Sequence, residues 1–263
     1  MDLSTICHNA NQLAERTGRF IRQELGQVGS AQIEEKSLNS LVSYVDKEAE
    51  TQLVEGLSQL VPGSVFLTEE DTVKDEEGEL RWIIDPLDGT TNFLFQLPVF
   101  AISLALEQKG EIVLGIVYEV NRQECFYAWK GGGAFLNGDP IQVSKRATLS
   151  ESLLATGFPY YDYERTQAYL KVLEQLMQNS RGIRRFGSAA VDLAYVACGR
   201  FDGFFEYSLQ PWDVAGGAII VQEAGGTITD FSGGGNWLHG QELIAANGKI
   251  SEAFLKTVRA HFG

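Results

Sequence analysis

The feature that most constrains the fold is a series of apolar segments between residues 81 and 130, each rich in β-branched and aromatic residues. These segments are "RWIID", "VFAISLALE", "EIVLGIVYEV" and "ECFYAWK". Lys109-Gly110 and Asn121-Arg122 supply short turns between the later segments, and short turns of this kind join neighbouring antiparallel strands. "GGGAFLNGDPIQVS" adds a glycine-rich turn and a further short strand. The series therefore predicts an antiparallel sheet in the first half of the chain.

The flanking segments follow a different pattern. Helical spacing of apolar residues predicts two helices ahead of the series, at residues 3–25 and 43–60, with a polar loop over residues 30–40. From about residue 150, predicted strands and helices alternate. In chain order they are strand 152–158, helices 163–179 and 187–199, strand 201–207, helix 212–226, strands 227–231 and 242–247, and helix 251–262. We expect one continuous domain with two fused lobes, α+β over residues 1–150 and α/β over residues 151–263.

Composition narrows the possible partners. The 263 residues carry a formal net charge of −14, whereas proteins bind phosphate backbones through Lys and Arg. We therefore expect no nucleic-acid partner. The N-terminal residues lack the pattern of a signal peptide, and the longest apolar stretch, residues 93–106, is interrupted by polar residues and a proline. Three widely spaced cysteines favour free thiols in a reducing compartment, so we expect a cytoplasmic protein without a membrane partner.

The stretch "WIIDPLDGTTNF" places two carboxylates, Asp85 and Asp88, at the end of an apolar strand. Pro86 cannot donate a ladder hydrogen bond, so we expect the strand to end at Asp85. Gly89 permits tight backbone geometry, and "GTTNF" is expected to open a helical turn whose amides suit an anion such as phosphate. Two carboxylates about 4 Å apart repel by roughly 4 kcal/mol. A hard cation such as Mg²⁺, Mn²⁺ or Ca²⁺ removes that cost, which predicts a metal site beside a phosphate site.

Two further acidic points have the same character. Glu69 and Glu70 follow the apolar segment "VFL", and Asp213 opens the apolar, glycine-containing segment "DVAGGAII". Each point also has a simpler interpretation. Asp213 is a candidate helix cap, and the two glutamates suit a solvated loop.

In combination these motifs are specific. "DPLDGTTNF", the upstream "EE" and the downstream "WDVAGG" have the order and spacing of the three motifs of the inositol monophosphatase family. The chain also resembles that family in "GGGAFLNGDPIQVS", "GSAAVDLAYVACGRFDGFFE" and "IAAN", so the resemblance covers almost its whole length. The family comprises Mg²⁺-dependent, lithium-sensitive phosphomonoesterases. The resemblance implies a layered αβαβα sandwich and a homodimer.

Carried over by position, the resemblance also implies roles for individual residues. The implied metal ligands are Glu69, Asp85, the backbone carbonyl of Leu87, Asp88 and Asp213. The implied catalytic residues are Glu69 and Thr90, which hold the attacking water, and Asp46, which polarises Thr90. The implied substrate contacts are Asp88, Gly89, Thr90, Gly187, Ser188, Ala189, Glu206 and Asp213. Among these, Glu206 would favour a polyol, because a carboxylate accepts hydrogen bonds from hydroxyl groups, although an acid at a strand end is the alternative.

Charge balance agrees with this chemistry. Four carboxylates contribute −4. Two Mg²⁺ ions, or Mn²⁺ in their place, neutralise that charge, and a third ion leaves about +2, which matches a phosphate dianion. The chain has no G-x-S-x-G and no P-loop motif, so hydrolysis by a metal-activated water is expected. Inositol monophosphate or a similar small polyol or sugar phosphate is the expected substrate. Fructose bisphosphate, histidinol phosphate and 3′-phosphoadenosine phosphate, which other relatives hydrolyse, are the alternatives.

The segment "KSLNSLVSYVD" departs from the family pattern. Lys36 and Asp46 are retained, but Ser40 stands where an aspartate is expected and Ser43 replaces a threonine. In the family that this chain resembles, that loop helps to order the most weakly held metal, so the number of ions and the lithium sensitivity stay open. A second class of function, an RNA- or polymerase-binding regulator, is known among relatives. The acidic composition counts against it, and the intact set of acids favours catalysis.

Overall fold

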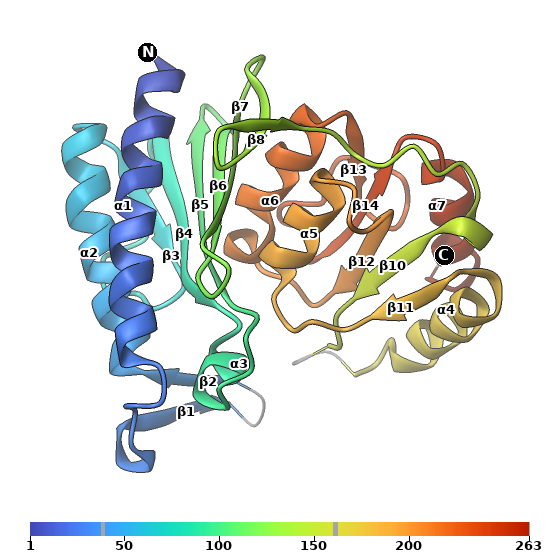
Figure 1. Cartoon of the computed structure of the whole chain (residues 1–263), viewed down its shortest axis with the longest axis horizontal. Helices are drawn as coiled ribbons and strands as arrows, with labels where there is room; N and C mark the ends of the chain where they lie inside the picture. Colours follow the sequence, from blue (N-terminus) through green and yellow to red (C-terminus); the bar gives the residue numbers. More distant parts are fainter. Residues whose placement is uncertain (38–39, 160–162, 263) are drawn as a thin grey trace.

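The computed structural model describes residues 1–37, 40–159 and 163–262. It has five layers, as Figure 1 shows: two helices, a seven-stranded sheet, two helices, a five-stranded sheet and two helices. The expected αβαβα sandwich is therefore confirmed. Among the described residues, no helix combines the length and the apolar character that a membrane span requires.

The first lobe consists of an outer helix pair and the larger sheet. Its elements are α1 (Leu3–Glu24), α2 (Tyr44–Leu60), β3 (Val65–Thr68), β4 (Leu80–Asp88), α3 (Thr90–Leu94), β5 (Ala101–Gln108), β6 (Glu111–Glu119), β7 (Glu124–Trp129), β8 (Gly133–Leu136) and β9 (Asp139–Ile141). The strands follow in chain order across the sheet, and every neighbouring pair is antiparallel except β3 with β4. The glycine-rich segment after residue 130 thus supplies two short strands where one was expected.

The second lobe alternates strands and helices, as predicted. Its elements are β10 (Leu153–Thr156), α4 (Thr166–Asn179), β11 (Gly182–Arg184), α5 (Ala189–Ala197), β12 (Gly203–Tyr207), α6 (Pro211–Glu223), β13 (Gly226–Thr229), β14 (Glu242–Asn247) and α7 (Ser251–Phe262), with two short 3-10 turns, Ser30–Gln32 and Leu149–Glu151, elsewhere in the chain. The sheet order is β11-β10-β12-β14-β13, and β14 runs antiparallel to both of its neighbours.

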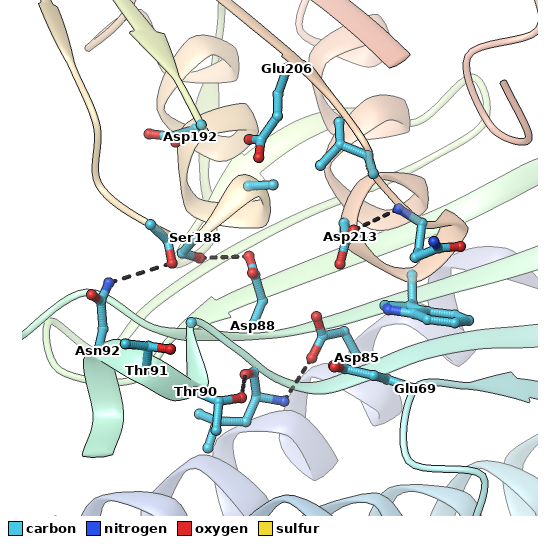
Figure 2. A pocket seen from close by; sticks show the side chains of 18 of the residues that line it. Glu69, Asp85, Asp88, Thr90, Thr91, Asn92, Ser188, Asp192, Glu206 and Asp213 are labelled. Atoms are coloured by element: carbon cyan, nitrogen blue, oxygen red, sulfur yellow. Dashed lines mark hydrogen bonds between the residues drawn. The ribbon is translucent and has the colours of Figure 1, made fainter. Parts of the chain in front are cut away.

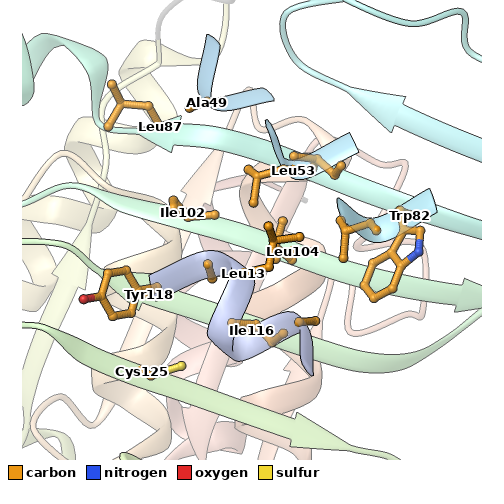
Figure 3. Close-up of a cluster of buried hydrophobic side chains, with 14 of the residues drawn as sticks. Leu13, Ala49, Leu53, Trp82, Leu87, Ile102, Leu104, Ile116, Tyr118 and Cys125 are labelled. Atoms are coloured by element: carbon orange, nitrogen blue, oxygen red, sulfur yellow. The ribbon is translucent and has the colours of Figure 1, made fainter. Parts of the chain in front are cut away.

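Burial explains the layering. Figure 3 shows the first core, where α1 and α2 place Leu13, Ala49 and Leu53 against Trp82 and Leu104 of the larger sheet. Helices α5 and α6 lie between the two sheets, and all nine residues of α5 are buried. A helix covered on both sides must be apolar all round, which explains the composition of "AAVDLAYVA". Any acid in such a helix is exceptional. The predicted lobe boundary at residue 150 stays a prediction.

Two local predictions were wrong. Residues 30–40 were expected to form a loop, but β1 (Ile33–Ser37) and β2 (Ser40–Ser43) pair as an antiparallel hairpin. The charged side chains of Glu34 and Glu35 are exposed, whereas Val42 of β2 is buried. The hairpin therefore combines a charged first strand with a partly apolar second strand. The side chains of Lys36 and Ser40 lie outside the described part of the structure.

The second correction concerns Pro86. The strand does not end at Asp85, because β4 continues to Asp88 through a bulge in which two residues of β4 face one residue of β5. The proline lacks an N–H, and the bulge places it where the ladder is already interrupted. The amide of Leu87 donates to Asp85 Oδ1 at 2.9 Å. The bulge lies at the carboxyl end of β4, where Asp85, Leu87 and Asp88 line the site described next.

Candidate active site

A cavity of about 140 Å³ lies where the carboxyl end of β4 meets the N-termini of α5 and α6. Figure 2 shows Glu69, Asp85 and Thr90 on one side of it, and Asp192 and Glu206 on the other. Both lobes contribute to its lining. All the substrate contacts that the resemblance implies line this cavity, namely Asp88, Gly89, Thr90, Gly187, Ser188, Ala189, Glu206 and Asp213.

Three aspartates converge in the cavity. Asp85, Asp88 and Asp213 each offer one carboxylate oxygen, and these oxygens all lie within 4.8 Å of one another. Asp85 and Asp88 come from the bulged end of β4, and Asp213 comes from the first turn of α6. We call these three residues the aspartate cluster. Glu69 lines the same cavity but is not one of the three.

The electrostatics of the aspartate cluster call for a cation. Burial raises the pKa of Asp85 well above its usual range, and the charges of Glu69, Asp88 and Asp213 raise it further. Burial, followed by the charge of Asp88, likewise raises the pKa of Asp213. Oxygen donors without sulfur or imidazole suit a hard divalent ion. The residues present therefore fit the metal that the sequence predicts.

Asp88 links the two lobes. Its Oδ2 accepts hydrogen bonds from Ser188 Oγ at 2.6 Å and from the amide of Ala190 at 2.7 Å. Ser188 is also the N-cap of α5, because its hydroxyl accepts from the amide of Val191. Burial raises the pKa of Asp88 to about 6 against these hydrogen bonds. One oxygen of Asp88 is thus held by α5, which leaves the other for a ligand.

Asp213 both supports a helix and belongs to the cluster. Gln210 is the N-cap of α6, and Asp213, at the third helical position, accepts from the Gln210 amide at 2.7 Å. The simple interpretation of Asp213 as the capping residue itself is therefore wrong by three positions. Its carboxylate closes a capping box and still reaches the cavity.

Thr90 is held by Asp46, as the resemblance implies. Thr90 Oγ1 lies 2.9 Å from Asp46 Oδ1 and 3.0 Å from the carbonyl oxygen of Leu87. Asp46 is only 1% exposed, and its Oδ2 accepts from both the amide and the hydroxyl of Ser43 at 2.8 Å. Burial raises the pKa of Asp46, and the hydrogen bonds from Ser43 and Thr90 oppose that rise. Ser43 therefore provides a hydroxyl at the position where the family has threonine.

Gly89 needs its lack of a side chain. It adopts a left-handed conformation with φ of 96° as the N-cap of α3. A Cβ there would lie 3.1 Å from the carbonyl oxygens of Gly187 and Val99. The expected helical turn is thus confirmed. Gly89, Thr90 and Thr91, at the start of this turn, line the cavity.

Sequence reasoning missed Glu50, which holds the loop that carries Glu69. Glu50 is fully buried in α2 and accepts from the amides of Glu70 and Thr72 at 2.8 and 2.9 Å, and from the Thr72 hydroxyl at 2.7 Å. The loop interpretation of Glu69 and Glu70 is therefore only partly right, because a buried carboxylate fixes this loop. A buried glutamate in an amphipathic helix gives no distinct sequence signal.

The lining residues that were given no site role from the sequence include Gly157, Arg185 and Asp192. Arg185 lines the cavity, whereas the side chain of its neighbour Arg184 is exposed. The signal for Asp192 was present as an acid inside the apolar segment "AAVDLAYVA".

Comparison with known proteins identifies the family. The model of the inositol monophosphatase family matches residues 2–262. An inositol-1-monophosphatase of Mesorhizobium japonicum is 41% identical over 94% of both chains. A protein of Neisseria meningitidis described as a putative Nus factor SuhB is 42% identical over 98% of this chain and 100% of its own.

Two solved structures show the same fold. The extragenic suppressor protein SuhB of Bartonella henselae has a TM-score of 0.90 at 42% identity, covering 94% of this chain and 96% of its own. An IMPase of Thermotoga maritima has a TM-score of 0.87 at 37% identity over 96% of both chains. The chain thus belongs to the inositol monophosphatase family, and it is a phosphoric monoester hydrolase.

Proposed function

We propose that the protein is a Mg²⁺-dependent phosphatase that hydrolyses inositol monophosphate or a similar small polyol or sugar phosphate. The observation that carries this proposal is the aspartate cluster, whose three carboxylates converge in a cavity that is also lined by Gly89 and Thr90. Mn²⁺ would suit the same oxygen donors.

The ligands are proposed to be the carboxylates of Glu69, Asp85, Asp88 and Asp213 with the backbone carbonyl of Leu87. Bound ions would neutralise these acids and the phosphate dianion, and would lower the pKa of a water. The protein supports this arrangement by fixing its donors: α5 holds Asp88, and the amide of Gln210 holds Asp213.

Thr90 and Glu69 are proposed to orient the attacking water. The hydroxyl of Thr90 donates a hydrogen bond to Asp46. The lone pairs of the hydroxyl oxygen can then accept a hydrogen bond from the water. The hydrogen bonds from Ser43 hold the carboxylate of Asp46 in the orientation that accepts the Thr90 hydrogen bond. The amides of Gly89 and Thr90 are proposed to bind the phosphate oxygens.

The opposite side of the cavity is proposed to bind the alcohol part of the substrate. Gly187, Ser188 and Ala189 lie at the start of α5, and Glu206 extends from the buried strand β12. Burial raises the pKa of Glu206 to about 8, and the nearby Arg185 opposes that rise. A carboxyl group at this position suits hydroxyl groups of a polyol.

A panel of phosphate esters tests this function. Release of inorganic phosphate from inositol 1-phosphate, fructose 1,6-bisphosphate, histidinol phosphate and 3′-phosphoadenosine phosphate would be measured with Mg²⁺ and with EDTA. We expect the highest kcat/KM for inositol 1-phosphate, because "GTTNF" resembles the inositol-type branch, and we expect EDTA to stop all turnover. Faster turnover of the adenosine phosphate, or turnover that survives EDTA, would contradict the proposal.

A regulatory role is the second candidate, and the description of the Neisseria protein as a putative Nus factor favours it. Binding of purified RNA polymerase or RNA to the immobilised protein would test it. Retention of either partner at physiological salt would support this role, and loss of all retention would leave catalysis alone. The homodimer that the family resemblance implies would be checked by light scattering.

A further inference from the structure

A buried acid in the cavity has no role in the functions proposed so far. Asp192 lies in α5 between the two sheets and is only 1% exposed. Its side chain lines the cavity, and its Oδ1 is buried without a hydrogen-bond partner among the described residues. A buried polar atom that lacks a hydrogen-bond partner destabilises the folded protein. Its presence at a cavity wall therefore indicates a ligand that completes it.

Asp192 lies on the same side of the cavity as Glu206. Figure 2 shows both beyond Ser188 and Asp88, away from Asp85 and Glu69. After burial itself, the charge of Glu206 is the largest influence that raises the pKa of Asp192, and Arg185 opposes it. We call Asp192 and Glu206 the acidic wall, and Arg185 provides its positive charge.

The backbone beside the acidic wall is shaped to admit a carboxylate. A Cβ at Gly157 would lie 2.0 Å from the carboxyl carbon and both oxygens of Glu206. Glu206 therefore occupies space that any other residue at position 157 would fill. The glycine allows the Glu206 carboxyl group to lie at the cavity wall although only 6% of the residue is exposed.

We propose that Asp192 and Glu206 together accept hydrogen bonds from two neighbouring hydroxyl groups on the alcohol part of the substrate, which makes Asp192 a specificity-determining residue. Polyol phosphates with such a diol are then the preferred substrate class. This inference rests on the proposed function and adds a residue to it. A carboxyl group keeps an acceptor oxygen whether or not it is protonated, and buried acceptors discriminate strongly against a ligand that lacks the matching hydroxyl.

The first test compares two substrates in Asp192→Asn. This variant keeps the shape of the side chain but replaces one acceptor oxygen with a donor. We expect the ratio of kcat/KM for inositol 1-phosphate to that for phenyl phosphate to fall about tenfold, mainly through KM. Glu174→Gln, an exposed change in α4, should leave the ratio unaltered. A purely structural role would lower kcat/KM for both substrates by the same factor. The ratio would then stay unchanged, and that result would overturn the inference.

The second test uses the wild-type protein and stands even if the variant does not fold. Deoxy analogues of inositol 1-phosphate remove one hydroxyl at a time. We expect two neighbouring positions at which the deoxy analogue loses about tenfold in kcat/KM. In Asp192→Asn one of those two analogues should lose nothing further, because its missing partner is already gone. Equal turnover of every analogue by the wild type would overturn the inference.

These outcomes separate the inference from the function beneath it. If the wild type releases no phosphate from either substrate with Mg²⁺ present, the proposed function fails. If it hydrolyses both substrates in an EDTA-sensitive way but phenyl phosphate equally well, the phosphatase stands and the acidic wall does not select polyols.

Discussion

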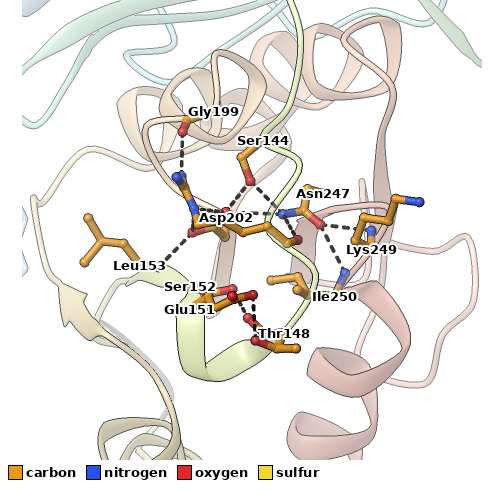
Figure 4. Close-up of polar contacts among 11 residues, drawn as sticks. Ser144, Thr148, Glu151, Ser152, Leu153, Gly199, Asp202, Asn247, Lys249 and Ile250 are labelled. Atoms are coloured by element: carbon orange, nitrogen blue, oxygen red, sulfur yellow. Dashed lines mark hydrogen bonds and ion pairs between the residues drawn. The ribbon is translucent and has the colours of Figure 1, made fainter.

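Two groups of buried aspartate in this protein have opposite surroundings. Asp202, fully buried ahead of β12, is surrounded by donors, as Figure 4 shows. Arg146 Nε lies 2.7 and 2.8 Å from its two oxygens, and the amide of Leu153 lies 2.8 Å away. The hydroxyl of Ser144 and the amide group of Asn247 complete this network. In the aspartate cluster, by contrast, the neighbours of each acid include other acids.

The contrast shows that burial of an acid does not by itself indicate whether the acid stabilises the fold or binds a ligand. A buried charge that is fully hydrogen-bonded within the protein supports the fold, whereas buried like charges are stable only with a ligand. Strongly raised pKa values occur in the cluster because desolvation and like charge act together. Groups perturbed in this way are candidates for function. The Asp202 network and the aspartate cluster should therefore respond to substitution in opposite ways.

The largest expected effect comes from Asp85→Asn. We expect kcat/KM with Mg²⁺ to fall at least about a thousandfold, or about 4 kcal/mol, because the substitution removes a proposed metal ligand. Without metal the variant should be more stable than the wild type, since one like charge has been removed. Phosphate release and thermal melting in EDTA would measure the two changes. Near-normal activity at saturating Mg²⁺ would remove the assignment of Asp85 as a ligand.

The change expected to have the opposite effect on stability is Asp202→Ala. We expect a loss of about 3 kcal/mol in the free energy of unfolding, because Arg146 and the amide of Leu153 lose their acceptor. The Arg146 side chain is 42% exposed and can turn to water, which limits the loss. Urea denaturation would measure it. The kcat per folded molecule should stay unchanged, and a selective loss of activity would break the distinction between the two groups.

Glu50→Gln tests an acid that has features of both groups. It is buried and fully hydrogen-bonded, yet its partners belong to the loop of Glu69. We expect a loss of about 1–2 kcal/mol in stability, since a glutamine nitrogen would face an amide N–H. The Mg²⁺ concentration for half-maximal activity should also rise. Glu55→Gln, an exposed change on the same helix, is the matched control, and equal Mg²⁺ dependence in both variants would refute this role.

The smallest effect is expected from Ser43. In Ser43→Ala the hydroxyl that caps α2 and contacts Asp46 is lost, which should cost about 1 kcal/mol. Ser43→Thr retains a hydroxyl and should remain close to the wild type in both melting temperature and kcat. A large activity loss in Ser43→Thr would show that the serine, and not merely a hydroxyl, is required at this position.

The motifs predicted the layers and the acidic site well because both rest on local patterns. Alternating apolar segments determine which residues are buried, and "DPLDGTT" contains most of its own turn chemistry. The β1–β2 hairpin was missed because its strands are only five and four residues long and the first one carries exposed charged side chains. The bulge at Pro86 was missed because a proline can mark the end of a strand or an interruption within it.

Other site residues could not be predicted for a different reason. Glu50 and Asp192 act through partners that lie far away in the sequence, and no local pattern records those partners. Asp192 lies in α5, and Glu206, whose charge adds to burial in raising the pKa of Asp192, lies in β12. Gly157, on a third segment, leaves the space that the Glu206 carboxyl group occupies. Only the folded chain brings these three residues to one wall.

The hydrogen bonds between Asp88 and the start of α5 have a consequence for the order of events during synthesis. Asp85 and Asp88 leave the ribosome about a hundred residues before Ser188 and Ala190, and Asp213 follows later still. A nascent chain that ends before residue 213 lacks one of the three converging aspartates. The growing protein therefore cannot assemble the complete aspartate cluster until the chain has been synthesised beyond α6.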